Sequence, residues 1–488
     1  MHIAIILVFI SYFLTPFQIF SVLNYGVTAI DLSLALCYII FFKKLIWDGM
    51  KIKIVPNLAL FALGFILLSA IITTIPVILS GDPKLLLQNF KTTIHFIFLV
   101  FFAVVNSFYP VNTKTWTNVV RTWLIIGLFI NLFAAYQIVA RAYDLPLAWI
   151  DYTNVSFVPK SETEADPSMV RQLSLSYGDF FRATSIFSEP SALALFNIYM
   201  FIFIFVPWLQ GHQPFFKSKT ITYIFLAFSV VGLLIAYSMT GVVGLGLVIG
   251  GYFLLERVKN YTKVWKIVIF AVIVIFITDF AVKSYTQISI VELFEKRITG
   301  IVEWGSETAI ATPGESFGVR MESGGKSFEI WKENPIFGVG LGLTYYQGKD
   351  IEYGDFGFLA AMAEMGLFGF FSFVGMFAFL LFITGFFIKN PQKLSFLDEE
   401  QKRIAGMSFY IMLLLFEINF ITGNNLVTIG LWMPVAMIFF IINTYYVKKG
   451  INVKEFSLVS VPFKKQLSLN LSRYLNYKMK SNRSSIEN

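Results

Sequence analysis

The sequence predicts an all-α integral membrane protein of about twelve transmembrane helices, and three observations support this class. Hydrophobic residues make up 57% of the 488 residues, charged residues only 14%, and the mean hydropathy is +0.71. Apolar runs recur at roughly the 20 residues that a helix needs to cross the hydrocarbon core. Lys and Arg collect in alternate connections between these runs. A water-soluble enzyme fold is excluded, because polar residues are too few to cover so much apolar surface.

Twelve apolar runs are expected to form the spans of a membrane domain over residues 1–447. The first run has no Lys or Arg before it and no small-residue cleavage site after it, so we interpret it as a retained helix. The run at 358–388 is longer than one crossing requires, and we expect it to tilt or break near Gly366 and Gly369. The twelve runs are 3–22, 26–42, 57–79, 89–107, 116–140, 190–209, 220–237, 241–255, 264–282, 358–388, 405–422 and 426–447.

The positions of Lys and Arg predict that both termini lie in the cytoplasm. In that orientation most of the 38 basic residues face inward, including those of the basic tail 448–488. The tail either lies as a helix on the anionic inner leaflet or remains solvated. Two long connections, about 141–189 and 283–357, then face outward and contain more acidic than basic residues. We expect any chemistry there, because a transporter would place its polar groups on broken helices at the bilayer midplane, within inverted repeats that this sequence does not display.

Several chemistries are disfavoured by the residues available. The single cysteine, Cys37, excludes a disulfide framework and a thiolate metal site, and with only three histidines a histidine metal centre is not expected. The string Gly324-Gly325-Lys326-Ser327 resembles the end of a P-loop, but the motif needs Gly at position 320, where the chain has Arg. The net charge of +8 does not indicate nucleic-acid binding, because the basic residues are spread over loops and tail.

The first outer segment that suggests chemistry runs from Arg182 to Ser191 and leads directly into the span at 190–209. Pro190 suits the first turn of that helix, with Ser188 as a candidate N-cap. The positive end of the helix dipole is then expected beside Arg182, which favours an anion. Glu189 is a candidate base, although a glutamate before a helix also simply stabilises the positive end.

The second outer segment contains Arg320, then Trp331, then the string Asn334-Pro335-Ile336-Phe337-Gly338-Val339-Gly340-Leu341-Gly342, and ends at Asp355 before the next span. This pattern resembles the O-antigen polymerase and O-antigen ligase superfamily. In that superfamily a long outer loop carries an Arg, a Trp further along, an Asn-Pro-aliphatic-x-Gly-x-Gly string and a polar residue that opens the next span. The number of spans and the two outer loops extend the resemblance over nearly the whole chain.

The resemblance implies a membrane glycosyltransferase of the C-type architecture that needs no metal and no other cofactor. Its implied donor and acceptor are undecaprenyl-diphosphate-linked glycans, and further partners would be membrane lipid and a chain-length regulator. The implied location is the bacterial inner membrane, with the active face in the periplasm. Two alternatives stay open: an O-antigen ligase that transfers finished polymer to lipid A-core or protein, and a polysaccharide or lipid transporter without transferase activity.

Arg320 and Arg182 are expected to bind the diphosphate leaving group. A planar guanidinium binds phosphate oxygens bidentately and stabilises the charge that grows as the glycosidic bond breaks. A base must also accept the proton of the acceptor hydroxyl. Ligase-like members have a His at the position of Asp355, and neither outer loop here contains a histidine. The resemblance therefore favours a polymerase, with Asp355 or Glu189 as the base.

Other residues are expected to contact the substrate. Many superfamily members have Ser-Arg where this chain has Ser238-Met239, so a donor-phosphate contact is missing there. The candidate replacements for that contact are Arg171, Lys326 and Lys332. Trp331 is a further candidate substrate contact, although Trp331 and the Gly338–Gly340 turn also suit a structural role in shaping the loop. Ionisable residues in or at the ends of spans are costly and often functional, which adds Asp31, Arg121, Glu364 and Glu417 as positions to inspect.

Overall fold

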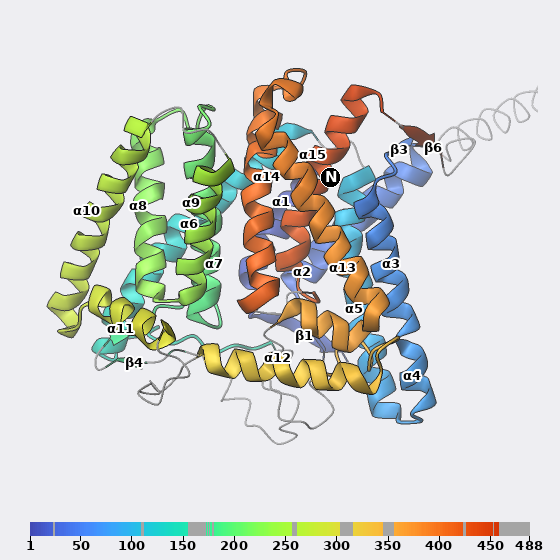
Figure 1. Ribbon diagram of the computed structural model, residues 1–488, viewed down its shortest axis with the longest axis horizontal. Coiled ribbons are helices and arrows are strands. Elements are labelled where there is room, and N and C mark those ends of the chain that lie inside the picture. Colours follow the sequence, from blue (N-terminus) through green and yellow to red (C-terminus); the bar gives the residue numbers. More distant parts are fainter. Residues whose placement is uncertain are drawn as a thin grey trace, which may run out of the picture.

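The computed structural model is built almost entirely of α-helices (Figure 1). It describes all residues except 23–24, 109–111, 155–171, 173, 175, 178–179, 256–260, 303–315, 345–355, 423–425, 452 and 458–488. The helices are α1 His2–Ser11, α2 Ala29–Phe42, α3 Leu58–Ile72, α4 Thr74–Leu79, α5 Pro83–Phe108, α6 Thr113–Ala142, α7 Pro190–Leu209, α8 Lys219–Ala236, α9 Met239–Leu255, α10 Tyr261–Thr286, α11 Ile290–Val302, α12 Ser316–Glu333, α13 Gly357–Lys389, α14 Glu399–Glu417 and α15 Ile429–Lys449.

Short strands form three antiparallel pairs within this helical chain. Two pairs are local, whereas the third joins the segment after α2 to the segment after α15. The strands are β1 Gln18–Val22 with β2 Tyr25–Thr28, β4 Ser176–Tyr177 with β5 Phe180–Phe181, and β3 Ile52–Ile54 with β6 Lys454–Phe456.

The helices confirm the predicted fold class. Each of the twelve predicted runs contains a helix, and nine helices of the described residues are long and apolar enough to cross a membrane. The helices α1, α2 and α9 are shorter. The expectation of one helix over 3–22 is wrong, because α1 ends at Ser11 and residues 18–22 form β1. Hydropathy alone does not separate a short apolar strand from the continuation of a helix.

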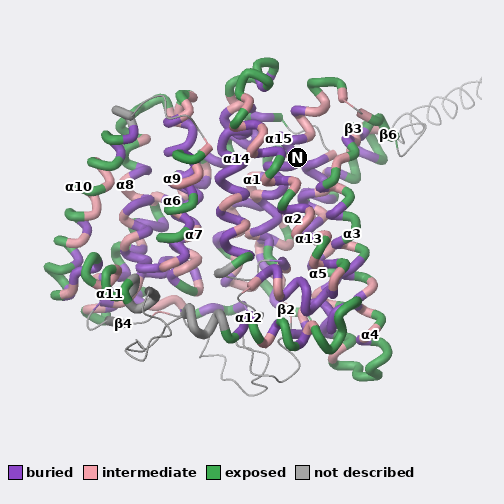
Figure 2. The backbone as a smooth tube through the Cα atoms, in the orientation of Figure 1, coloured by how far each residue is buried: buried purple, intermediate pink, exposed green. Residues whose placement is uncertain are grey.

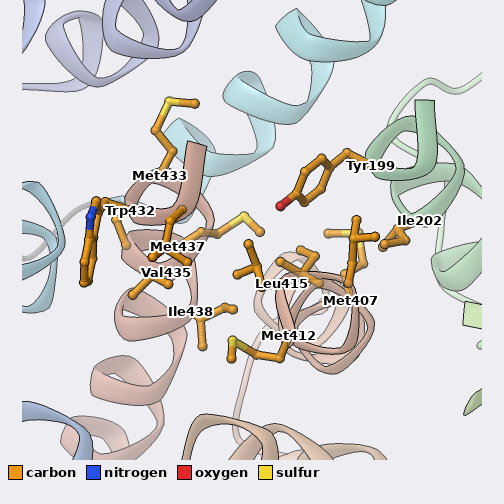
Figure 3. Close-up of a cluster of buried hydrophobic side chains, with 14 of the residues drawn as sticks. Tyr199, Ile202, Met407, Met412, Leu415, Trp432, Met433, Val435, Met437 and Ile438 are labelled. Carbon is orange, nitrogen blue, oxygen red and sulfur yellow. The ribbon is translucent and has the colours of Figure 1, made fainter. Parts of the chain in front are cut away.

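The core lies where α7, α14 and α15 pass through the middle of the bundle (Figure 2). Most residues of these helices are buried, which is the pattern of a helix surrounded by other helices. Tyr199, Met407, Leu415 and Met437 are buried in this region, whereas Trp432 points from the other side of α15 toward α5 (Figure 3). Around this centre, α13 packs against α3 and α14, α8 packs against α7, and α5 packs against α15. The long aromatic and methionine side chains therefore fill a shared interior between helices that are distant in sequence.

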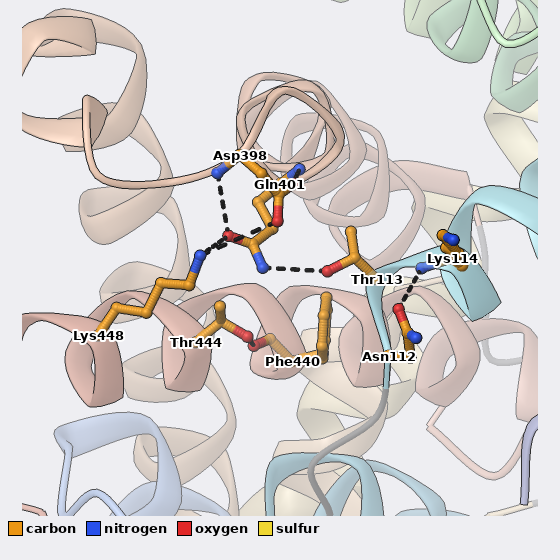
Figure 4. A network of polar contacts seen from close by, with 8 residues as sticks. All are labelled: Asn112, Thr113, Lys114, Asp398, Gln401, Phe440, Thr444 and Lys448. Atoms are coloured by element: carbon orange, nitrogen blue, oxygen red, sulfur yellow. Dashed lines mark hydrogen bonds and ion pairs between the residues drawn. The ribbon is translucent and has the colours of Figure 1, made fainter.

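The two ends of the bundle differ in composition. At the end that we call the loop end, α11 and α12 lie across the helix ends together with the β1–β2 and β4–β5 hairpins (Figure 1). The opposite end, the terminal end, holds the start of α1 and the end of α15. There Gln401 of α14 donates a hydrogen bond to Thr113 of α6 (3.0 Å) and accepts one from Lys448 of α15 (2.7 Å; Figure 4). The described parts of the two predicted outer loops thus lie at one end of the bundle, opposite to the start of α1 and the end of α15.

The described part of the second outer connection contains two helices, α11 and α12. The Gly324-Gly325 pair lies inside α12, although glycine disfavours helix interiors by about 1 kcal/mol. Packing explains why a glycine is found inside this helix. Helix α12 lies against α13, and a Cβ on Gly324 would approach the Phe356 ring to 2.7 Å. The absence of a side chain at position 324 allows this close contact.

Candidate functional site

A buried arginine organises the first outer segment. Arg141 ends α6, and its guanidinium donates hydrogen bonds to the carbonyl oxygens of Ala148 (2.9 Å) and Arg182. It also donates to Gln172 Oε1 (2.8 Å) and Thr184 Oγ1 (2.7 Å), and it lies 4.1 Å from the ring centroid of Trp149. Because one side chain binds the backbone or side chains at four places, it fixes the course of the chain around Arg182.

Gln137, one turn before Arg141, extends this network. Its amide donates to Gln172 Oε1 (3.1 Å) and to the carbonyl oxygen of Ser185 (3.1 Å). Burial raises the pKa of the nearby Tyr152 phenol above its ordinary value, so that this hydroxyl stays neutral. The sequence analysis did not single out Gln137 or Arg141. The available signal was two polar residues four positions apart, hence on one face of an otherwise apolar helix.

Arg182 lies between this network and the turn that joins α8 to α9. The Ala183 N–H donates to the Ile235 carbonyl at the end of α8 (2.9 Å), and Tyr237 ends that helix in a left-handed conformation with φ of 44°. Arg182 itself is half-buried, directly after β5. The segment from Arg182 therefore contacts the end of α8, shortly before Ser238-Met239, where the resemblance indicated an arginine in place of Met239.

Glu189 forms the N-cap of α7, with Pro190 in the first turn as predicted. The expectation that Ser188 is the N-cap is wrong by one residue. Glu189 is exposed and makes no capping hydrogen bond with its side chain, so its carboxylate is accessible at the loop end. Arg182 and Glu189 thus share one segment that leads into α7.

Helix α12, which lies across the loop end of the bundle, carries three of the candidate charged residues. The backbone of Arg320 belongs to the first turns of α12. Lys326 Nζ pairs with Glu322 (2.9 Å), and Lys332 Nζ pairs with Glu329 (2.8 Å). These exposed pairs along one helix contribute little stability. Both lysines therefore lie at the surface beside carboxylates of their own helix.

Trp331 fixes the turn that follows α12. Its indole N–H donates to the Pro335 carbonyl oxygen (3.1 Å), and the half-buried ring packs beside Ile330, Val339 and Ala363. This contact joins α12 to the segment 334–344, which we call the glycine segment. The geometry matches the loop-shaping role considered for Trp331.

The glycine segment encloses a break in α13. Gly366 has φ of 64° and ψ of −167°, a conformation that interrupts the helix where the sequence predicted a tilt or break. The Val339 and Gly340 N–H groups donate to the carbonyl oxygens of Ala363 (2.9 Å) and Glu364 (3.1 Å), which the interruption makes available. A Cβ on Gly338 would lie 2.3 Å from the Glu364 carbonyl oxygen, so only glycine fits this approach.

Three of the ionisable span residues gain identified partners. The buried Glu364 accepts from Thr344 Oγ1 at its carboxylate (2.7 Å) and from Thr73 Oγ1 at its carbonyl (2.8 Å). Arg121 donates to the Phe215 carbonyl oxygen (2.9 Å) near the terminal end. Asp31 accepts from Tyr25 and Thr28 at the start of α2. Glu417 is buried at the end of α14.

The remaining candidates divide into those outside the described residues and those at the loop end. Arg171 and Asp355 lie outside the described residues, as do the Arg320 side chain and the tail after 457. In the described part of the chain, no group of three or more His, Cys, Asp or Glu side chains is arranged to hold a metal ion. Arg182, Glu189, Lys326, Trp331 and Lys332 all belong to segments at the loop end.

These features define a multi-pass α-helical membrane protein whose polar segments are fixed across one end of the bundle. Residues 224–374, from within α8 to the kinked α13, match the family model described as O-antigen ligase. This part of the chain is therefore similar to the O-antigen ligase family. It includes α12, the glycine segment and the Gly366 break. No curated protein matches the chain.

Proposed function

We propose that this protein polymerises undecaprenyl-diphosphate-linked oligosaccharide repeat units into O-antigen, capsule or another exopolysaccharide. The observation that carries the proposal is the family match over residues 224–374, the region that contains α12 and the glycine segment. The segment from Arg182 to Glu189 lies at the same end of the bundle and contacts the end of α8. The protein would work in the bacterial inner membrane, with the loop end in the periplasm.

In the proposed reaction, a sugar hydroxyl of one lipid-linked unit attacks the anomeric carbon of the growing chain. The bond to the diphosphate carrier breaks, and its electron pair leaves on the diphosphate oxygen. Arg182 and Arg320 are the proposed partners of that oxygen, because guanidinium groups stabilise growing negative charge at a water-poor site. The Arg141 network supports this role for Arg182, since it fixes the backbone that carries the side chain.

The hydroxyl proton must pass to a base as the new bond forms. Asp355 and Glu189 are the proposed candidates. The exposed Glu189 carboxylate, at the N-cap of α7 without a capping hydrogen bond, is accessible for this role. Arg171, Lys326 and Lys332 are proposed as further substrate contacts at the same end. For the two lysines, binding a phosphate would require exchange of the present carboxylate partner.

The absence of histidine from residues 141–189 and 283–357 favours a polymerase over a ligase. A ligase would use the same donor but transfer the finished polymer to lipid A-core or to a protein. A transporter would move a substrate without forming a glycosidic bond. These three functions leave different products in the cell, so one experiment separates them.

The test compares cells that lack the protein with cells complemented by wild type, Arg320→Ala or Arg182→Ala, on gels of surface glycolipid and lipid-linked glycan. For each variant we expect single repeat units and a loss of long polymer of about a hundredfold, the usual effect of removing one charge-stabilising donor. Asp355→Asn and Glu189→Gln, run on the same gel, identify the base by which of them loses the ladder.

Arg297→Ala is the matched control, because it removes an arginine from α11 at the same end but outside the motif. It should keep the full ladder. Long polymer retained on the lipid carrier in the deletion strain would instead indicate a ligase. An unchanged ladder in the deletion strain would contradict a transferase function.

A further inference from the structure

A second polar cluster lies at the loop end, formed by Tyr25, Asp31, Thr92 and His95. The Tyr25 hydroxyl donates to Asp31 Oδ1 (3.0 Å), and the His95 Nε2 atom lies 3.8 Å from the same oxygen. The rings of Tyr25 and His95 have their centroids 5.0 Å apart. Thr28 completes the carboxylate's partners through its N–H and its hydroxyl, both at 2.8 Å.

The cluster continues along one face of α5. Gln88, Thr92 and His95 recur at intervals of four and three residues, which places them in one stripe. A polar stripe with an ionisable pair is costly against hydrocarbon, and such groups in spans face protein or a water-filled cavity. The His95 and Asp31 side chains are 26% and 13% exposed, so neither is fully enclosed by protein atoms. The other two histidines, His2 and His212, contact Thr115 and Glu399 at the terminal end.

Two contacts join the chain that leads into the β1–β2 hairpin to the segments around Arg141 and Arg182. Asn154, two residues after the Tyr152 that adjoins the Arg141 network, donates to the Thr15 carbonyl (2.7 Å) before β1. Phe187, within the segment from Arg182 to Glu189, packs on Phe13 with ring centroids 6.4 Å apart. The β1–β2 hairpin that carries Tyr25 therefore adjoins the arginine segment.

The cluster also adjoins the glycine segment. A Cβ on Gly342 would lie 2.7 Å from Thr92 Oγ1, and Asn89 Nδ2 donates to the Leu341 carbonyl oxygen (3.2 Å). Thr92 thus lies where the glycine segment contacts α5, and His95 lies about one helical turn further along that helix. A glycan attached to a diphosphate bound near Arg182 could extend along α5, where Thr92 and His95 offer polar side chains.

We propose that Tyr25, Thr92 and His95, with Asp31 as positioning residue, bind a sugar residue of the lipid-linked glycan. This inference rests on the proposed function. Sugar hydroxyls both donate and accept hydrogen bonds, and the cluster offers an imidazole, two hydroxyls and two ring faces for such contacts. Asp31 holds Tyr25 and His95 in place, because its carboxylate faces both side chains.

The experiment measures the binding of two probes to the full-length protein in detergent. One probe is the glycan freed from its lipid by mild acid, prepared from the lipid-linked units of cells that lack the protein; it has no diphosphate. The other is undecaprenyl diphosphate without glycan. We expect His95→Ala and Thr92→Ala to weaken binding of the free glycan about tenfold, the loss of about one hydrogen bond, and to leave binding of the diphosphate lipid unchanged.

Arg182→Ala and Arg320→Ala should show the opposite pattern, with weaker diphosphate binding and unchanged glycan binding. His212→Gln is the matched histidine control and should bind both probes like wild type. His95→Asn, whose amide still forms hydrogen bonds, should restore part of the glycan binding if His95→Ala folds poorly. Kinetic measurements on His95→Ala and Thr92→Ala, with either the donor or the acceptor glycan varied, show which of the two occupies the site. The KM for that glycan should rise.

Equal glycan binding by wild type, His95→Ala and Thr92→Ala would overturn the subsite while leaving the proposed polymerase intact. Failure of wild type to bind either probe would overturn both the subsite and the proposed function. A fall in kcat alone, with both KM values and glycan binding unchanged, would also contradict a binding role.

Discussion

At the scale of single residues, Arg141 holds the first outer segment of the candidate site in place. Its guanidinium satisfies acceptors from three separate stretches of the first outer connection, and it is itself only 6% exposed. A methionine at this position fills similar space but removes the donor to the Ala148 carbonyl and to Thr184 Oγ1. Gln172 Oε1 and the Arg182 carbonyl would still accept from Gln137 and Ser174. Each unsatisfied buried group costs roughly 1 to 3 kcal/mol.

We therefore expect Arg141→Met to lower the free energy of unfolding by roughly 2 to 3 kcal/mol and to reduce polymer formation by displacing the Arg182 backbone. Arg141→Lys keeps the charge but lacks the forked geometry, so its effect should fall between those of methionine and wild type. The measurement is SDS-induced unfolding in mixed micelles together with the polymer gel. Wild-type stability for Arg141→Met would show that the network does not hold the segment.

The broken helix α13 is the feature that matters most at the scale of elements. Its interruption at Gly366 frees carbonyl oxygens that the glycine segment binds, and a Cβ on Gly366 would lie 2.1 Å from the Ile336 carbonyl oxygen. The same helix contains Gly375, where a Cβ would meet no atom within 4 Å. One helix thus offers a glycine that its conformation requires and one that it does not.

Gly366→Ala should destabilise the protein by more than about 2 kcal/mol, because it adds both backbone strain and a collision, and it should abolish the ladder with the glycine segment displaced. Gly375→Ala should be neutral or stabilising by about 0.5 to 1 kcal/mol, since alanine favours a helix interior. Thermal unfolding in detergent compares the two. Equal effects of the two substitutions would mean that the break does not support the fold.

The elements show where prediction from sequence succeeded and where it stopped. The spans and the Gly366 break were predictable, because long apolar runs have few alternative structures in a membrane and glycine disfavours a helix interior. Helix α12 was not predictable, since its polar sequence contains Gly324 and Gly325 and owes its helical form to packing on α13. The roles of Arg182, Arg320 and Glu189 stay predictions that rest on the sequence pattern. The roles of Arg141 and Asp31 needed contacts between residues far apart in sequence.

The molecule as a whole separates its two polar surfaces by the length of the bundle. The outer segments and hairpins occupy the loop end, whereas the network of Gln401, Thr113 and Lys448 occupies the terminal end (Figure 4). Basic residues concentrate in the connections at the terminal end, which predicts that this end faces the cytoplasm.

Cysteine labelling in intact cells tests this orientation. Cys37 is the chain's single cysteine and is fully buried, so the wild type should give little background with a membrane-impermeant thiol reagent. Lys332→Cys, on α12, should react in cells with a permeable outer membrane. Lys217→Cys, between α7 and α8, should react only after the inner membrane is opened. The reverse labelling pattern would invert the topology and place the candidate site in the cytoplasm.

The packing of α15 against α5 also governs how the chain is assembled during synthesis. Helix α5 leaves the ribosome more than 300 residues before α15 does, yet α15 covers one of its faces. Until the last helix is inserted, that face must be shielded by lipid, by other early helices or by the insertion machinery. The bundle therefore closes only after nearly the whole chain has been translated, and ribosome stalling before residue 429 would leave an open intermediate that quality-control proteases can recognise.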